Sequence, residues 1–457
     1  MSPHPLQTIL CALLASALAA GGCRDPSPAP PRVFLVTVDT LRADHLGLYG
    51  YPRDTSPFLD SLGEEGLVFA TAYSSCSHTA PSHASLFTSL QPAQHRVLRN
   101  GEELHESLPT LARLFRDQGY RTAAITTTSF LKGLDSGFDH FHHETRYHPA
   151  KILLDRAAEW IRSRETREKL FVWIHLFDVH EWSRDDHVDR EALEEVRDRG
   201  PSGETLLDFL GREHGTDLDF GGAKVRRAVD RYDAQILSAD RGLALFYDAM
   251  TSDGLARDAL WVVTSDHGEG LGNHRYMGHG KTVYDEQIRV PLLFYFADRR
   301  FTPRRLPGLA RLVDVAPTLA ELLGTSFDGG TIPAVGRSFL PLFEDPEAAW
   351  DVRTVFAQRR PADDLRLRQG WIPGEVFALR TERYKLIGHS GAENEVYDLE
   401  RDPFELENLA GNGSAELERL LAGLERSYRA LVAQGEHVGA GEINPEYVEE
   451  LRALGYL

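Results

Sequence analysis

The stretch Val33-Phe-Leu-Val-Thr-Val-Asp39-Thr40 is an apolar run that ends at a carboxylate. A short run of this kind, rich in valine and bounded by other segments, is typical of a strand buried on both faces of a parallel sheet. Similar runs recur at 121–126, 170–177, 259–264 and 290–296, and they alternate with helical patterns at 107–118, 148–164, 224–250 and 313–323. The alternation predicts an α/β fold with a mainly parallel central sheet flanked by helices.

Acidic residues stand just past the ends of three of these strands, at Asp39, Asp178 and Asp266. Ligands of open α/β sheets bind beyond the carboxyl ends of the strands. We therefore expect a functional site at this edge, built from segments that are far apart in the sequence.

A second stretch, Thr79-Ala-Pro81-Ser-His83-Ala-Ser-Leu-Phe-Thr-Ser89, predicts the start of a helix. Proline suits the first helical turn because it has no N–H to lose there and its φ is already fixed. The helix N-terminus is expected to offer free N–H groups and a positive dipole end to an anion. An alcohol held at this point, Thr79, is a candidate nucleophile toward a sulfate or phosphate ester.

These stretches resemble motifs of the sulfatase family, which has an alkaline phosphatase-like fold. The segment from Thr79 resembles the signature Cys/Ser-x-Pro-x-Arg, whose first residue is oxidised to formylglycine. Here Thr79 takes the first position and His83 takes the place of the arginine. Threonine has no unbranched Cβ alcohol or thiol from which the aldehyde could form, so Thr79 is expected to act as an alcohol.

The resemblance also implies a set of metal ligands. Residues 33–44 resemble the opening metal motif, with Asp39 as the first ligand and Thr40 in place of a second aspartate. Thr264-Ser-Asp266-His267-Gly-Glu269 resembles the second motif, so the implied set is Asp39, Thr79, Asp266 and His267. Such a small set with one nitrogen favours one Zn²⁺ or Mn²⁺ ion, with Ca²⁺ as the alternative. A similar set, with a threonine nucleophile, occurs in phosphoethanolamine transferases and lipoteichoic acid synthases.

Two further segments resemble the substrate side of the family's site. Phe177-Asp178-Val-His180 offers His180 as a general acid, a role that suits a histidine titrating near neutral pH. In Gly278-His279-Gly-Lys281, His279 is expected either to contact the transferred group or to complete a second metal site with Asp178 and His180. Lys281 is interpreted as an anion clamp or as a solvated side chain, and His83 as a support for Thr79 or its ester.

One part of the family pattern is missing. In sulfatases the strand that corresponds to 121–126 is followed by a lysine and a histidine that bind sulfate, whereas this sequence has threonines and Ser129 there. The expected set of cationic side chains around a sulfate is therefore incomplete, and this slightly favours a phosphoester over a sulfate ester.

The chain has 457 residues, of which 50 are basic and 69 acidic, giving a net charge of −19. This charge argues against a nucleic-acid partner.

Residues 1–22 are interpreted as a signal peptide, because the apolar part, 9–20, is too short to span a bilayer. Ala20-Gly-Gly-Cys23 resembles a bacterial lipoprotein cleavage box, so Cys23 is expected to carry lipid and 23–32 to form a proline-rich tether. The predicted location is the bacterial cell envelope, lipid-anchored outside the cytoplasm.

The predicted organisation has two parts, a catalytic domain over 33–345 and a small C-terminal α+β subdomain with terminal helices over 346–457. Within the second part we expect an antiparallel pair at 376–381 and 384–387, a strand near 395, a helix at 414–434 and a short helix near 445–454. A charged stretch at 183–219 is interpreted as a solvated surface insertion.

The leading hypothesis is a metal-dependent hydrolase of sulfate or phosphate esters, acting on a small molecule or a glycan. Two alternatives remain open at this stage. One is a catalytically impaired sulfatase-like protein that binds anionic glycans, and the other is a phospho-group transferase of the cell envelope.

Overall fold

The computed structural model describes residues 28–144, 146–165, 167–201, 203–348, 353–368, 370–438 and 447–453. The signal peptide, Cys23 and most of the predicted tether lie outside these residues. The end of that tether is part of the fold: the Pro31 carbonyl accepts a hydrogen bond from Leu170 N, and β1 already begins at Arg32. No helix in the described part of the chain is long and apolar enough to cross a membrane.

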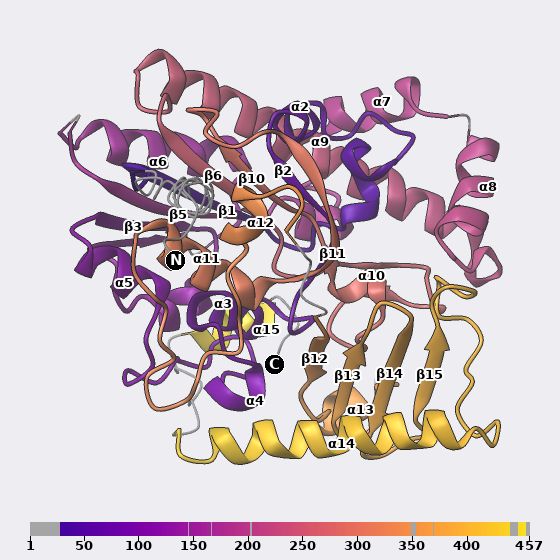
Figure 1. The fold of residues 1–457 in the computed structure, drawn as a ribbon. Coiled ribbons are helices and arrows are strands. Elements are labelled where there is room, and N and C mark those ends of the chain that lie inside the picture. The colour runs from indigo at the N-terminus through magenta and orange to yellow at the C-terminus, as the bar shows by residue number, and fades with distance from the viewer. Residues whose placement is uncertain are drawn as a thin grey trace, which may run out of the picture.

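A large mixed sheet forms the centre of the molecule, and its core is parallel (Figure 1). In spatial order its strands are β11 (Arg304–Arg311), β2 (Leu67–Tyr73), β10 (Leu292–Phe296), β6 (Ala259–Thr264), β1 (Arg32–Val38), β5 (Leu170–Leu176), β3 (Arg121–Thr126) and β4 (His140–His143), and β9 (Arg289–Val290) pairs with β2. Strand β10 is antiparallel to both neighbours, and every other pair along this path is parallel. The predicted α/β class is confirmed. The run at 290–296 is divided by Pro291 into β9 and β10, because proline cannot donate to a ladder.

Helices cover both faces of this sheet. Alternate residues of β1 point to opposite sides, so they belong to two different cores. Val33 and Leu35 belong to the core beneath α3, α5 and α11, and Phe34 and Val36 to the core beneath α2, α6 and α9. The bounds are α2 (Pro57–Glu64), α3 (Thr79–Thr88), α4 (Pro92–His95), α5 (Leu111–Asp117), α6 (Ala150–Arg162), α9 (Gly222–Ser252), α10 (Asp285–Ile288), α11 (Val315–Leu322) and α12 (Leu340–Glu344).

The charged stretch at 183–219 contains two helices, α7 (Arg190–Arg199) and α8 (Gly203–Glu213). Ala192, Leu193 and Val196 of α7 are buried against Ala234 and Leu237 of α9. The interpretation as a solvated excursion is therefore wrong for α7, because apolar positions at helical spacing give it a core-facing side.

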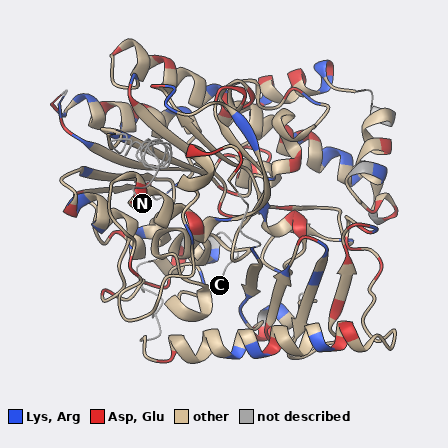
Figure 2. Cartoon of the chain, in the orientation of Figure 1, with Lys and Arg blue, Asp and Glu red and all other residues tan. Residues whose placement is uncertain are grey.

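The C-terminal part forms a separate antiparallel sheet with one long helix across it, at the bottom of Figure 1. Its elements are β12 (Val355–Arg359), α13 (Asp364–Arg368), β13 (Val376–Arg380), β14 (Tyr384–His389), β15 (Glu395–Asp398) and α14 (Ala415–Gly435), and α15 (Val448–Ala453) follows. Gln358 N donates to Ser75 O, so β12 is joined to the loop just before α3. This contact brings the second part of the chain to the expected site. Figure 2 marks charged residues of both signs along α14.

Candidate active site

Helix α3 begins at Thr79 and is buried along its whole length. Ser82 Oγ donates to Asp266 O, which joins the first turn of α3 to the loop after β6. Two N–H groups of the first turn are already used: Ala80 N donates to Asn100 Oδ1 and Ser82 N donates to His78 O, and Pro81 has none. The expectation that these groups form an anion seat is therefore corrected. The positive end of the helix dipole remains.

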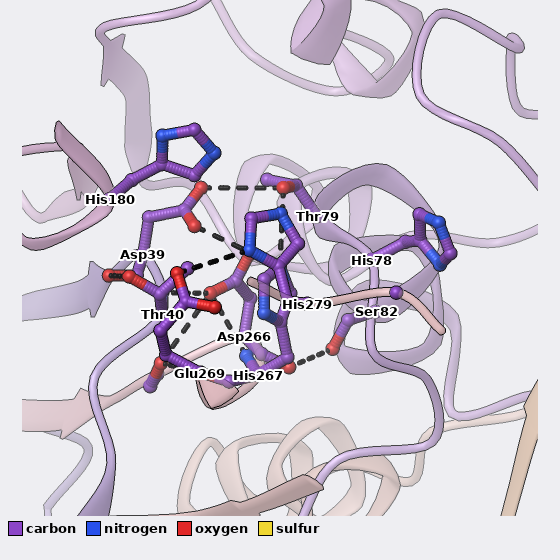
Figure 3. Close-up of polar contacts among 12 residues, drawn as sticks. Asp39, Thr40, His78, Thr79, Ser82, His180, Asp266, His267, Glu269 and His279 are labelled. Carbon is purple, nitrogen blue, oxygen red and sulfur yellow. Dashed lines mark hydrogen bonds and ion pairs between the residues drawn. The ribbon is translucent and has the colours of Figure 1, made fainter. Parts of the chain in front are cut away.

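Three predicted ligands surround the Thr79 hydroxyl (Figure 3). Thr79 Oγ1 lies 3.3 Å from Asp39 Oδ2 and 3.4 Å from His267 Nε2. His267 Nε2 lies 3.5 Å from Asp266 Oδ2 and 3.8 Å from Asp39 Oδ1. Strands β1 and β6 are adjacent and parallel, so their ends deliver both carboxylates to the same place.

This group of side chains fits a divalent cation. Asp39 Oδ1 and Asp266 Oδ2 are buried and have no hydrogen-bond partner among the described residues. His267 Nδ1 donates to Gly268 O, which leaves the Nε2 lone pair directed at the carboxylates, as in metal-bound histidines. Buried carboxylates without partners are costly unless a cation balances them. Thr40 adds no ligand, because its hydroxyl donates to Asp39 O.

The two carboxylates differ in their acidity. Burial and the nearby negative charge of Asp39 raise the pKa of Asp266. Burial opposes ionisation of Asp39 as well, but His175, His180 and His267 outweigh it and hold the pKa of Asp39 below its usual value.

A layer of polar side chains beneath these residues was not predicted as part of the site. His175 of β5 lies with Nε2 3.3 Å from Asp39 Oδ2 and Nδ1 3.0 Å from Thr37 Oγ1. Trp173 Nε1 donates to the same threonine oxygen. These residues sit inside apolar strands, where the sequence pattern indicates only core. Their polar atoms fix the position of Asp39 from below.

His83 belongs to this lower layer rather than to the substrate side. Its Nδ1–H donates to Thr79 O at 2.8 Å, and Nε2 lies 3.0 Å from Thr37 Oγ1. Both ring nitrogens are thus engaged, and burial lowers the pKa of His83 well below its usual value. The predicted substrate-binding role is corrected: a neutral His83 can hold the backbone of Thr79 but presents no ring nitrogen to an ester.

Two histidines lie on the open side of Thr79 (Figure 3). His180 Nδ1 contacts Glu181 Oε1 at 3.1 Å, and His279 Nδ1 contacts Glu269 Oε2 at 3.4 Å. Burial lowers the pKa of His180, but Glu181 and Asp39 outweigh it, so the net pKa is raised. The rings of His180 and His279 are 5.0 Å apart between centroids. Each is held by a carboxylate to which the sequence interpretation gave no role.

Asp178 and Lys281 lie elsewhere. Asp178 Oδ1 accepts hydrogen bonds from Ala150 N and Tyr147 OH. Among the described residues, Asp178, His180 and His279 do not gather into a group that could hold a metal ion, so the suggested second metal site finds no support. Lys281 Nζ lies 5.7 Å from the Tyr276 ring centroid. Gly280, between His279 and Lys281, passes so close to His78 that a Cβ there would lie 2.7 Å from its Nε2.

The fold and this constellation define an ester hydrolase of the alkaline phosphatase-like class, built to act on sulfuric or phosphoric esters. A family model described as "Sulfatase" matches residues 31–325, and one described as "N-sulphoglucosamine sulphohydrolase, C-terminal" matches 272–433. The chain belongs to the sulfatase family.

Individual relatives are distant but span most of the chain. The multifunctional alkaline phosphatase superfamily protein PehA of Trinickia caryophylli is 26% identical, over 83% of this chain and 91% of the relative. The Delta 4,5-hexuronate-2-O-sulfatase of Bacteroides thetaiotaomicron is 23% identical, over 86% of this chain and 87% of the relative. The solved phosphonate monoester hydrolase of Agrobacterium radiobacter superposes with a TM-score of 0.66 at 19% identity, over 89% of this chain and 96% of that one.

Proposed function

We propose that this protein hydrolyses sulfate or phosphate esters with Thr79 as the nucleophile, at one divalent metal ion held by Asp39, Thr79, Asp266 and His267. The observation that carries the proposal is the position of the Thr79 hydroxyl between Asp39 and His267, beside two buried carboxylate oxygens that have no hydrogen-bond partner in the described part of the chain. The donor set suits Zn²⁺ or Mn²⁺, with Ca²⁺ as the alternative. When bound, such an ion supplies Lewis-acid chemistry that lowers the pKa of an alcohol and neutralises charge on an ester oxygen.

The first step is attack by Thr79. Its hydroxyl proton is released to solvent water, Asp39 Oδ2 orients the hydroxyl by accepting its hydrogen bond, and the oxygen forms a bond to phosphorus or sulfur. The bond to the leaving oxygen breaks, and His180 donates a proton to that oxygen. The raised pKa of His180 favours its protonated form, which is the form that a general acid requires.

The second step releases the threonine ester. Neutral His180 takes a proton from a water molecule, and the water oxygen bonds to phosphorus or sulfur as the Thr79 oxygen leaves. That oxygen regains a proton from solvent water. His279, held by Glu269, and the N-terminal end of α3 stabilise the charge of the transferred group.

A phosphoester is slightly favoured as the substrate. The hydroxyl of Thr127, in the segment after β3, donates to the His175 carbonyl, and Thr126 Oγ1 donates to backbone carbonyls. This segment therefore offers no cation to a sulfate. The similarity to a phosphonate monoester hydrolase supports this preference, whereas the similarity to the hexuronate sulfatase supports a sulfated glycan.

The experiment is to assay matched aryl phosphate, phosphodiester and sulfate esters with the purified protein, before and after removal of bound metal. We expect turnover that is lost with the metal and restored by Zn²⁺ or Mn²⁺. After reaction with a fast aryl ester and acid quenching, mass spectrometry should find the transferred group on Thr79. An adduct on any other residue, or metal-independent turnover, would contradict the proposed chemistry.

We also propose that the enzyme is exported and held at the membrane by lipid on Cys23, as the motif Ala20-Gly-Gly-Cys23 suggests. Cys23→Ser should move the protein from the membrane fraction to the soluble extracytoplasmic fraction. Equal membrane association of both forms would argue against the anchor.

A further inference from the structure

Basic side chains from the C-terminal part gather next to the start of α3. We name Arg359, Arg360 and Arg366 the arginine cluster. Arg359 ends β12, Arg360 follows it, and Arg366 lies on α13. Trp371 lies between them, with its ring 5.6 Å from Arg359 Cζ and 4.9 Å from Arg366 Cζ.

Two members of the cluster, Arg359 and Arg360, have few negative partners among the described residues for their burial. Arg359 is 1% exposed, and its terminal nitrogens donate only to the backbone carbonyls of Arg360 and Ile372. Arg360 is 8% exposed, and its ion-pair partner is Asp363 at 3.3 Å, a carboxylate whose side chain is 45% exposed. The Nε atoms of Arg359 and Arg360 have no hydrogen-bond partner among the described residues. Because buried charges are normally paired, the cluster has the composition of an anion site.

His78 connects this cluster to the catalytic residues. It directly precedes Thr79, and its ring centroid is 6.2 Å from that of Trp371. Lys281, on the loop that carries His279, is close enough to Arg366 for its own pKa to be lowered. The cluster therefore lies beside the nucleophile, on the side where Figure 3 places His78.

We propose that the arginine cluster binds a second anionic group of the substrate, a carboxylate, sulfate or phosphate distinct from the ester that is hydrolysed. This inference rests on the proposed function and specifies its substrate as a molecule with at least two anionic groups. Guanidinium groups suit this role because they bind such oxygens through two parallel hydrogen bonds. In Figure 3 His180 and His78 lie on opposite sides of Thr79, so the second anion approaches from the side of His78, β12 and α13.

The test compares non-hydrolysable ligands that differ by one carboxylate. Calorimetry measures the Kd of benzylphosphonate and of three benzylphosphonates that carry a carboxylate at the meta position, at the para position or on a para methylene. At least one carboxylated ligand should bind about tenfold more tightly than benzylphosphonate. In Arg360→Gln this preference should disappear, and in Arg360→Lys it should fall but persist. Arg383→Gln is the matched control, because Arg383 lies in the same sheet region but pairs with Asp398 at the surface.

Arg366→Gln provides a second test if Arg360→Gln unfolds, and thermal unfolding identifies that case. The proposal is overturned if no carboxylated ligand is preferred, or if both cluster variants keep the preference. It is also overturned if the variants weaken the binding of benzylphosphonate as much as the binding of its carboxylated forms. The cluster would then bind the phosphonate, which takes the place of the hydrolysed ester, and not a second anionic group. Binding requires no turnover, so a carboxylate preference in a protein that cleaves no ester would refute the proposed hydrolysis and leave this inference standing.

Discussion

Thr79 Oγ1 lies 3.3 Å from Asp39 Oδ2, although the two residues come from different elements, the N-terminus of α3 and the end of β1. The contact depends on the sheet edge and on the position of α3. Ser82 joins α3 to the loop after β6, and Gln358 N donates to Ser75 O in the loop before α3. An alcohol fixed in this way, with its oxygen next to a carboxylate and an imidazole, needs no posttranslational aldehyde to be a nucleophile. The predictions below test this arrangement.

Thr79→Val should abolish turnover while the protein stays folded. Valine matches the shape of threonine but has no hydroxyl, so kcat should fall by roughly 10³ or more if the ester is covalent. Thr79→Ser keeps the hydroxyl and should retain most of the activity that Thr79→Val loses. Steady-state kinetics on the best aryl ester measure both, and similar activity of Thr79→Val and the parent protein would remove Thr79 from the mechanism.

Asp266→Asn should lose the metal but keep the local backbone. Asp266 Oδ1 accepts hydrogen bonds from Thr40 N and His267 N, and an asparagine oxygen can continue to do so. The unpartnered Oδ2 would become an NH₂ group, which has no lone pair for a cation. Metal content should fall at least about tenfold by elemental analysis at matched free metal. Asp178→Asn is the control, because Asp178 contacts α6 instead, and its metal content should not change.

Much of the fold could be predicted because strand runs such as 33–38 and 259–264 are almost entirely apolar, a pattern typical of a sheet covered on both faces. Strand β2, Leu67–Tyr73, was missed, although it lies inside the large sheet. Nothing in its local sequence shows that it pairs with β10 and β11, which follow it by more than two hundred residues.

The candidate site likewise contains residues that motifs reveal and residues that only the pairing of distant strands brings together. Asp39, Asp266 and His267 stand at strand ends within recognisable motifs, so sequence and structure bring them together. His175 could not be found this way, because it is an interior residue of an apolar strand. Its place follows from the register, in which Thr37 and His175 are paired across β1 and β5 and so share a face. The arginine cluster likewise depends on the contact between β12 and the loop before α3.

Glu181→Gln should shift the pH dependence of catalysis. Glu181 contacts His180 Nδ1 and helps to raise the pKa of that histidine against the effect of burial. Without the carboxylate the pKa of His180 should fall, so the general acid loses its proton at a lower pH. The basic limb of the kcat/KM profile should therefore move to lower pH. His187→Gln removes the other imidazole that contacts Glu181 and is the comparison, because it leaves the carboxylate beside His180. An unchanged basic limb in Glu181→Gln would exclude His180 as the acid.

His274→Asn should alter the pH dependence of stability rather than of activity. His274 Nδ1 contacts Glu286 at 2.8 Å, and Nε2 donates to the Glu405 carbonyl, which joins the catalytic part to the C-terminal sheet region. Burial lowers the pKa of His274, but Glu286 and Glu405 outweigh it and raise it from 6.5 to about 9. The folded state thus binds this proton more tightly than the unfolded state, and the resulting stabilisation is complete below pH 6.5.

That stabilisation, at most about 3 kcal/mol, should be lost as pH rises from 6.5 through 9. In denaturant titrations at fixed free metal, the parent protein should lose unfolding free energy across this window, and His274→Asn should show a flatter dependence. The variant should be clearly less stable at pH 6 and should approach the parent above pH 9. Asparagine is the suitable replacement because residue 274 has φ of 48°, a left-handed conformation that asparagine tolerates. Parallel curves for the two proteins would show that His274 is neutral in the folded state and that the contact with Glu286 is an ordinary hydrogen bond.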